Sequence, residues 1–125
     1  MKRRAYTLIE LLIVMIILSM ILAIALPAYF EAYADAKVKA ANSNTKTLVT
    51  SFQHAYVKGG GTSYAAIDPE LVRSEMNGWP SNPCYSTRGA DGWSMTRQQN
   101  GMMVVPKNDQ GCGALLGMIL GEMRP

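Results

Sequence analysis

The sequence predicts an α+β protein in which a long N-terminal helix packs against a small C-terminal head with a short antiparallel sheet. Three observations carry this prediction. No glycine interrupts the chain from Tyr6 to Val57, Asn100-Gly101 separates two strand-like runs, and two cysteines, Cys84 and Cys112, lie in the C-terminal half. At 125 residues the chain has room for one small domain beside such a helix.

The chain begins with a short basic segment. Lys2, Arg3 and Arg4 account for the whole net charge of +3, because the other nine basic residues balance nine acidic ones. The charge balance therefore does not indicate nucleic-acid binding. By the positive-inside rule, these three residues hold the amino terminus in the cytoplasm and place everything after a membrane span on the far side.

An apolar segment follows, and it contains one carboxylate. The stretch from Leu8 to Leu26 has 19 residues, which at about 1.5 Å per residue crosses a hydrocarbon core of about 30 Å. Glu10 lies inside it at a cost of about 3 kcal/mol, so this residue is expected to be functional and to have a partner. The alternative is a secretory signal peptide that ends at Ala25, although a signal that is discarded has no use for a buried charge.

This arrangement resembles the type IV pilin and pseudopilin family, which combines a basic leader, a cleavage point, a Thr-Leu-Ile-Glu core and a long hydrophobic helix. The family usually has Gly before the cut and often Phe after it, where this chain has Ala and Tyr. The order of short helix, Pro-rich loop and late cysteine weakly resembles type IVb pilins. The residues that match are Ala5, Tyr6, Thr7, Leu8, Ile9, Glu10 and Pro27.

The resemblance implies processing and a division of the chain. A prepilin peptidase would cut between Ala5 and Tyr6, and the new amino group of Tyr6 would be N-methylated. The implied segments are a leader at 1–5, a transmembrane and filament-core helix at 6–27, an amphipathic continuation at 28–58 and a globular head at 59–125.

The resemblance also implies roles in assembly. Glu10 of one subunit would pair with the Tyr6 ammonium of a neighbour, and Pro27 would matter for assembly. The alternative for Glu10 is contact with water or lipid headgroups. The adjoining packing surface would consist of Thr7, Leu8 and Ile9.

The second half of the helix is expected to be amphipathic. Pro27 predicts a bend or a loosened turn at the membrane exit, where the rings of Tyr29, Phe30 and Tyr33 suit the interface. Gly59-Gly60-Gly61 predicts the end of the helix. A narrow stripe for packing the head is predicted at Val38, Ala41, Thr45, Leu48, Phe52 and Ala55.

The head shows further local signals. Asp68-Pro69-Glu70 predicts the start of a short helix that ends near Met76, before Asn77-Gly78. The Pro-rich stretch 79–83 predicts irregular structure. Strand-like runs at 93–98 and 102–105 flank Asn-Gly, whose two residues tolerate positive φ, so an antiparallel hairpin is expected. The last segment, 109–123, is predicted to close the head as a helix or a strand, with glycines at four-residue steps that would allow close helix approach.

The two cysteines are expected on the exported side, where a disulfide between Cys84 and Cys112 is favoured. Closing that loop would contribute about 3 to 4 kcal/mol on the chain-entropy model. A zinc site that uses both cysteines and His54 is the alternative, although the Cys-x-x-Cys spacing typical of such sites is missing.

These observations exclude several function classes. His54 is the one histidine and no nucleophile elbow or carboxylate cluster is present, so catalysis, a cofactor and a metal are not expected. The resemblance implies a structural subunit that waits in the inner membrane, contacts its peptidase and an assembly platform, and forms an extracellular homo-oligomeric filament for adhesion or another task. The alternatives are a minor pilin, a type II secretion pseudopilin, or a monomeric binding module that is secreted or anchored.

Overall fold

The computed structural model describes residues 5–61, 63–86, 92–99 and 101–121. Three predicted features lie partly outside the described residues: leader residues 1–4, Asn100 of the hairpin turn, and the end of the last segment at 122–123. The chain divides into two compact units, Met1–Asp35 and Ala36–Pro125.

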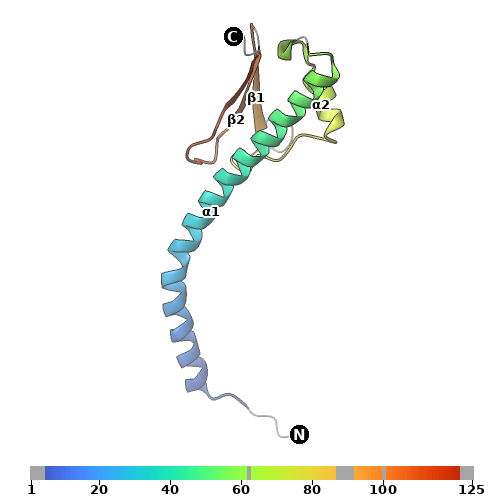
Figure 1. The fold of residues 1–125 in the computed structure, drawn as a ribbon. Helices are drawn as coiled ribbons and strands as arrows, with labels where there is room; N and C mark the ends of the chain where they lie inside the picture. The colour runs from blue at the N-terminus through green and yellow to red at the C-terminus, as the bar shows by residue number, and fades with distance from the viewer. Residues whose placement is uncertain (1–4, 62, 87–91, 100, 122–125) are drawn as a thin grey trace. The chain divides into compact units, whose positions relative to one another are not determined.

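The predicted long helix is confirmed as α1 (Leu8–Lys58), which contains Pro27 (Figure 1). It ends at the three glycines as expected. The N–H of Gly61 donates to the Tyr56 carbonyl over 2.9 Å, and Gly60 and Gly61 have φ of 87° and 68°. An L side chain rarely adopts these angles, so glycine is needed to stop the helix here.

The head begins with two short helical elements, η1 (Tyr64–Ala66) and α2 (Pro69–Glu75). The carboxylate of Asp68 accepts a hydrogen bond from the Glu70 N–H over 3.1 Å, which confirms the predicted N-cap. Asn77 and Gly78 follow α2 with positive φ, and the Gly78 N–H donates to the Arg73 carbonyl. Local capping chemistry therefore defines both ends of α2.

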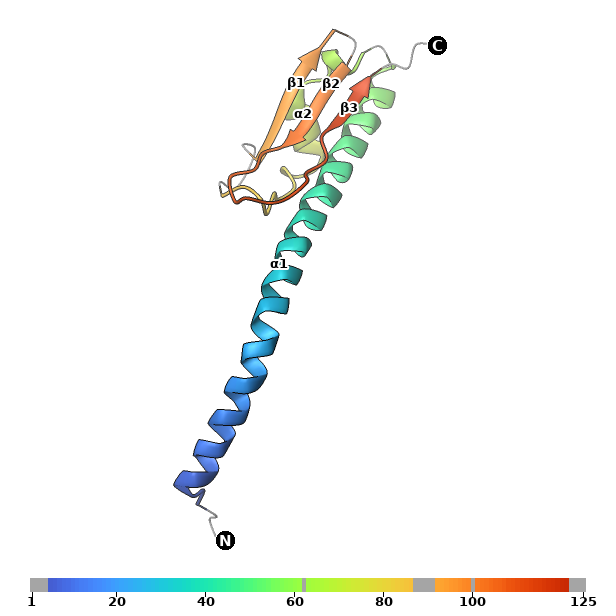
Figure 2. The ribbon, with the colours of Figure 1, turned by 90° about the vertical axis from the view of Figure 1, so that its left-hand side faces the viewer.

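Three strands form one antiparallel sheet in the order β1 (Trp93–Gln98), β2 (Gly101–Pro106) and β3 (Met118–Gly121), as Figure 2 shows. The last predicted segment thus contains a strand at 118–121, and its glycine spacing serves no helix contact there.

The hairpin is confirmed, but the reason for its glycine was wrong. Gly101 pairs with Gln98 as the first residue of β2 and is not among the positive-φ residues of the described chain. A Cβ at Gly101 would lie 2.1 Å from the carbonyl oxygen of Leu120 in β3. Glycine is needed because the neighbouring strand approaches closely.

One hydrophobic core joins α1 and α2 to the inward face of the sheet. The predicted stripe on α1 is largely confirmed: Ala41, Thr45, Leu48 and Phe52 are buried, together with Val49. The ring of Phe52 stacks on Trp79 with 6.5 Å between centroids. The residues that meet this helix face in the core are Val72, Trp93, Met102, Val104 and Leu120.

The disulfide between Cys84 and Cys112 is confirmed, with 5.8 Å between the Cα atoms. Because both sulfurs are bonded to each other, the zinc alternative that required both thiolates is wrong. Asn82 supports the start of this loop: its side-chain amide donates to the carbonyls of Gly92 and Lys107 and accepts from the Cys84 N–H.

Candidate assembly site

The N-terminal end of α1 is built around a reciprocal pair of residues. The carbonyl of Thr7 accepts the first helical hydrogen bond, from the Leu11 N–H, so Thr7 is the N-cap. The Thr7 N–H donates to Oε2 of Glu10 over 2.8 Å, and the Glu10 N–H donates to Oγ1 of Thr7 over 3.4 Å. This is a capping box, in which two helix-end donors are satisfied by the two side chains.

The capping box determines where the Glu10 carboxylate lies. The Thr7 hydroxyl also donates to Oε2 of Glu10, over 3.0 Å, so both hydrogen bonds from Thr7 to this carboxylate use the same oxygen. Within the part of the chain that the structure describes, Oε1 has no hydrogen-bond partner. The negative charge lies at the positive end of the helix dipole, which stabilises it.

The predicted cleavage point lies directly before this box. Tyr6, whose side chain is 82% exposed, immediately precedes Thr7, and Ala5 precedes Tyr6 outside any helix. Leu8 and Ile9 occupy the first turn and are exposed. The structure therefore brings Thr7 and Glu10 together, and Tyr6 directly precedes the residue whose N–H binds the carboxylate.

Sequence reasoning missed the partner that Glu10 finds within its own chain. The expectation assigned Glu10 to a neighbouring subunit, with water or lipid as the alternative, and treated Thr7 as packing surface. The signal was present in the spacing Thr-x-x-Glu before an apolar run, which is the capping-box pattern.

The rest of the first half of α1 offers an apolar surface that no part of its own unit covers. Every side chain described from Leu8 to Leu26 is exposed. An 18-residue window in α1 has a mean hydropathy of 3.0, so by length and composition the helix is able to cross a membrane. The hydroxyl of Ser19 is satisfied locally, because it donates to the Met15 carbonyl over 2.6 Å. Such a surface needs lipid or protein around it.

An aromatic group follows Pro27 within the same unit. The rings of Tyr29 and Tyr33 stack with 6.4 Å between centroids, and Phe30 meets Tyr29 edge-on at 6.0 Å. All three side chains are exposed. Amphipathic rings at the end of an apolar helix are typical of a membrane interface.

Comparison with protein families now gives an independent result. Residues 1–26 match the prokaryotic N-terminal methylation motif, which is the signal of type IV pilins and pseudopilins. The chain carries a prepilin-type signal. This motif belongs to structural, pilin-type proteins and, with the apolar helix, agrees with a membrane-anchored pilin-like protein that is a substrate of prepilin peptidase. Comparison with curated proteins and with solved structures gave no match.

Beyond the prepilin-type signal, the only histidine of the sequence, His54, lies near the end of α1. The side chain of His54 is 72% exposed, and its Nδ1 lies 3.9 Å from Oε2 of Glu75. Glu75 also accepts a hydrogen bond from Nζ of Lys58 over 2.6 Å, and this bond lowers the pKa of the Glu75 carboxyl. Lys58 and Glu75 thus link the end of α1 to α2 through an exposed ion pair.

Proposed function

We propose that this chain is a structural subunit of a type IV pilus filament, processed by prepilin peptidase and polymerised through its hydrophobic N-terminal helix. The observation that supports this most directly is the Glu10 carboxylate, which Thr7 holds at the start of an exposed apolar helix. Thr7 is the second residue after the predicted cut, and Glu10 is the fifth. A charge in that position needs a cationic partner once the surroundings are apolar.

Cleavage between Ala5 and Tyr6 would supply that partner. The peptide nitrogen of Tyr6 becomes an ammonium group, and its N-methylation retains the positive charge. Because the capping box uses Oε2 of Glu10, Oε1 remains to accept from the Tyr6 ammonium of a neighbouring subunit. Capping within one chain and pairing between chains are therefore compatible, and together they determine the register of adjacent helices.

The apolar surface would then have two environments in succession. Before assembly the helix lies in the inner membrane, with Lys2, Arg3 and Arg4 initially on the cytoplasmic side and the head on the other. After extraction by the assembly platform, neighbouring helices replace lipid around it. Both environments are apolar, so the transfer need not expose this surface to water. The head would form the outer surface of the filament and mediate its outward functions, such as adhesion.

Two matched variants test the pairing. Glu10→Gln keeps an acceptor that completes the capping box but removes the charge, whereas Glu10→Ala removes both. We expect both variants to be cut at Tyr6 and to remain in the membrane. Losing one partner of an ion pair in apolar surroundings costs about 3 to 5 kcal/mol, so filament yield should fall by more than about a hundredfold.

The outcomes separate the alternatives. If Glu10→Gln assembles like the wild type and Glu10→Ala does not, Glu10 acts through capping alone. If both assemble normally, the pairing is wrong. A wild-type chain that never forms filaments would refute the filament subunit and would favour the monomeric binding module. A minor pilin or a type II secretion pseudopilin shares the same N-terminal apparatus, and the disulfide-bonded head favours a pilus subunit.

A further inference from the structure

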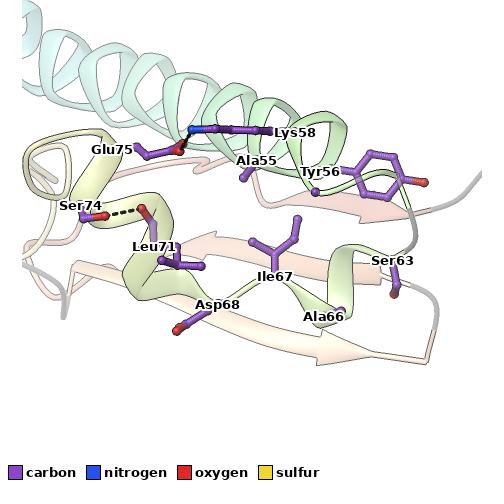
Figure 3. Close-up of a pocket in the computed structure, with 11 residues that line it drawn as sticks. Ala55, Tyr56, Lys58, Ser63, Ala66, Ile67, Asp68, Leu71, Ser74 and Glu75 are labelled. Carbon is purple, nitrogen blue, oxygen red and sulfur yellow. Dashed lines mark hydrogen bonds and ion pairs between the residues drawn. The ribbon is translucent and has the colours of Figure 1, made fainter.

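A groove lies in the head between the end of α1 and the segment that contains η1 and α2. Its volume is about 400 Å³. Figure 3 shows Ile67 and Ala55 pointing toward one another across it, with Leu71 beside them on α2. Leu71 is 64% exposed, which is high for a leucine next to other apolar side chains. We call this feature the α1/α2 groove.

The charges around the α1/α2 groove do not balance. Lys58 and Glu75 close one end as an ion pair of 2.6 Å and neutralise each other. Asp68 lies at the rim, pointing away from α1 in Figure 3, and forms no ion pair with any residue in the described ranges. Its carboxylate accepts the capping hydrogen bond from the Glu70 N–H. The groove thus combines an apolar floor with one negative charge that no cation among the described residues pairs with.

The opposite side of α1 carries cations. Lys46 lies nine positions before Ala55, and an α-helix turns about 100° per residue, so the two side chains lie about 180° apart around the axis. Lys39, sixteen residues before Ala55, projects from nearly the same side as Lys46. Both lysines are exposed, and neither forms an ion pair with another described residue.

We propose that the α1/α2 groove of one subunit binds the Lys46 side chain of a second copy of this chain. The methylenes of Lys46 would cover Ile67 and Leu71, and its ammonium would reach Asp68, in the way that lysine side chains cover apolar surface and keep the charge at the edge. This inference rests on the proposed filament and identifies a contact between its heads.

The geometry favours a filament over a closed dimer. Groove and cation lie on opposite faces of α1, so the contact joins two different surfaces and leaves one of each free for the next copy. Along the axis, Lys46 and Ala55 are separated by about 14 Å. Successive copies would therefore be displaced by about this distance along α1, and Lys39 would require a larger displacement of about 24 Å.

Zero-length cross-linking of intact filaments tests the contact. A carbodiimide joins a carboxylate to an amine only where they touch, and filaments assembled from mixed ¹⁴N- and ¹⁵N-labelled chains distinguish links between subunits from links within one. We expect a mixed-isotope peptide that joins Asp68 to Lys46. Filaments in which Asp68 reacts only within its own chain, or not at all, overturn the contact and leave the proposed function standing. A chain that forms no filaments overturns the proposed function itself.

Charge-removing variants provide a second test. Asp68→Asn keeps the N-cap acceptor of α2 and removes the charge, so folding is retained. Lys46→Met keeps a similar stem without the ammonium, and Lys39→Met is the matched control. We expect each of the first two variants to raise the critical concentration for assembly about tenfold, with the double variant no worse than either single one, and the control to be unchanged. Independent, additive effects of Asp68→Asn and Lys46→Met would refute direct pairing.

Discussion

Asn82 connects three segments of the head through one buried side chain, so removing it should destabilise the head more than its size indicates. The residue is 9% exposed. Its Nδ2 donates to the Gly92 carbonyl over 2.7 Å and to the Lys107 carbonyl over 2.9 Å, and its Oδ1 accepts from the Cys84 N–H over 3.0 Å. Asn82→Ala leaves these three backbone groups without that partner.

The cost follows from the number of bonds. A hydrogen bond contributes about 1 kcal/mol net, and a backbone group left buried and unpaired costs about 1 to 3 kcal/mol. Three lost bonds therefore give about 3 kcal/mol in the free energy of unfolding. A small domain is stable by about 5 to 15 kcal/mol, so this loss is a large share of the total.

Urea denaturation of the full chain in detergent micelles, followed by the fluorescence of Trp79 and Trp93, measures this effect. With a slope of about 1.5 kcal/mol per molar urea, the midpoint should fall by about 2 M. The control is Asn44→Ala, which removes one exposed hydrogen bond to the Ser81 carbonyl and should cost less than about 1 kcal/mol. If the two variants lower the stability equally, the three-way role of Asn82 is wrong.

Three further changes have defined outcomes. Replacing both cysteines by serine opens a loop of 28-residue separation and should lower the unfolding free energy by about 3 to 4 kcal/mol in calorimetry. Gly101→Ala would place a Cβ 2.1 Å from a β3 carbonyl oxygen and should abolish hydrogen-exchange protection in β3, whereas Gly113→Ala, with nothing within 4 Å, should not. The Lys58 ammonium lowers the pKa of Glu75 below 4.5. This pair should therefore stabilise the head above that pH and lose its contribution as the pH falls through the lowered pKa. In urea titrations at pH 6 and pH 3, Lys58→Met should reduce the difference in unfolding free energy between the two pH values.

Elements with local chemical signals could be predicted from the sequence. Two of the three consecutive glycines, Gly60 and Gly61, determined the end of α1 through their positive φ, and Asp68 before Pro69 determined the start of α2. The antiparallel pair of β1 and β2 followed from two strand-like runs around Asn-Gly. In each case the decisive interaction lies within a few residues along the chain.

Features that depend on distant contacts could not be predicted in the same way. Met118–Gly121 has a glycine directly before it and another at its end, and it forms a strand because β2 supplies partners such as Met102 for Leu120. The requirement for Gly101 comes from β3, which no local pattern shows. The α1/α2 groove needs the chain reversal at Gly60 and Gly61 to bring its walls together.

At the candidate site, two physical effects act on the same carboxylate. The Thr-x-x-Glu spacing indicates a capping box, whereas the cost of a charge in lipid favours a partner outside the chain. Helix capping also uses this carboxylate, because Thr7 lies close enough to satisfy one oxygen of Glu10 within the same chain.

The intact mass and the N-terminal residue of the protein, taken from sheared filaments and from membranes, test the proposed function most directly. Prepilin processing predicts a chain that starts at N-methylated Tyr6 in both fractions. A mature chain that starts at Leu26 would mean that residues 1–25 are a secretory signal peptide, and the proposed filament helix would not exist in the mature protein.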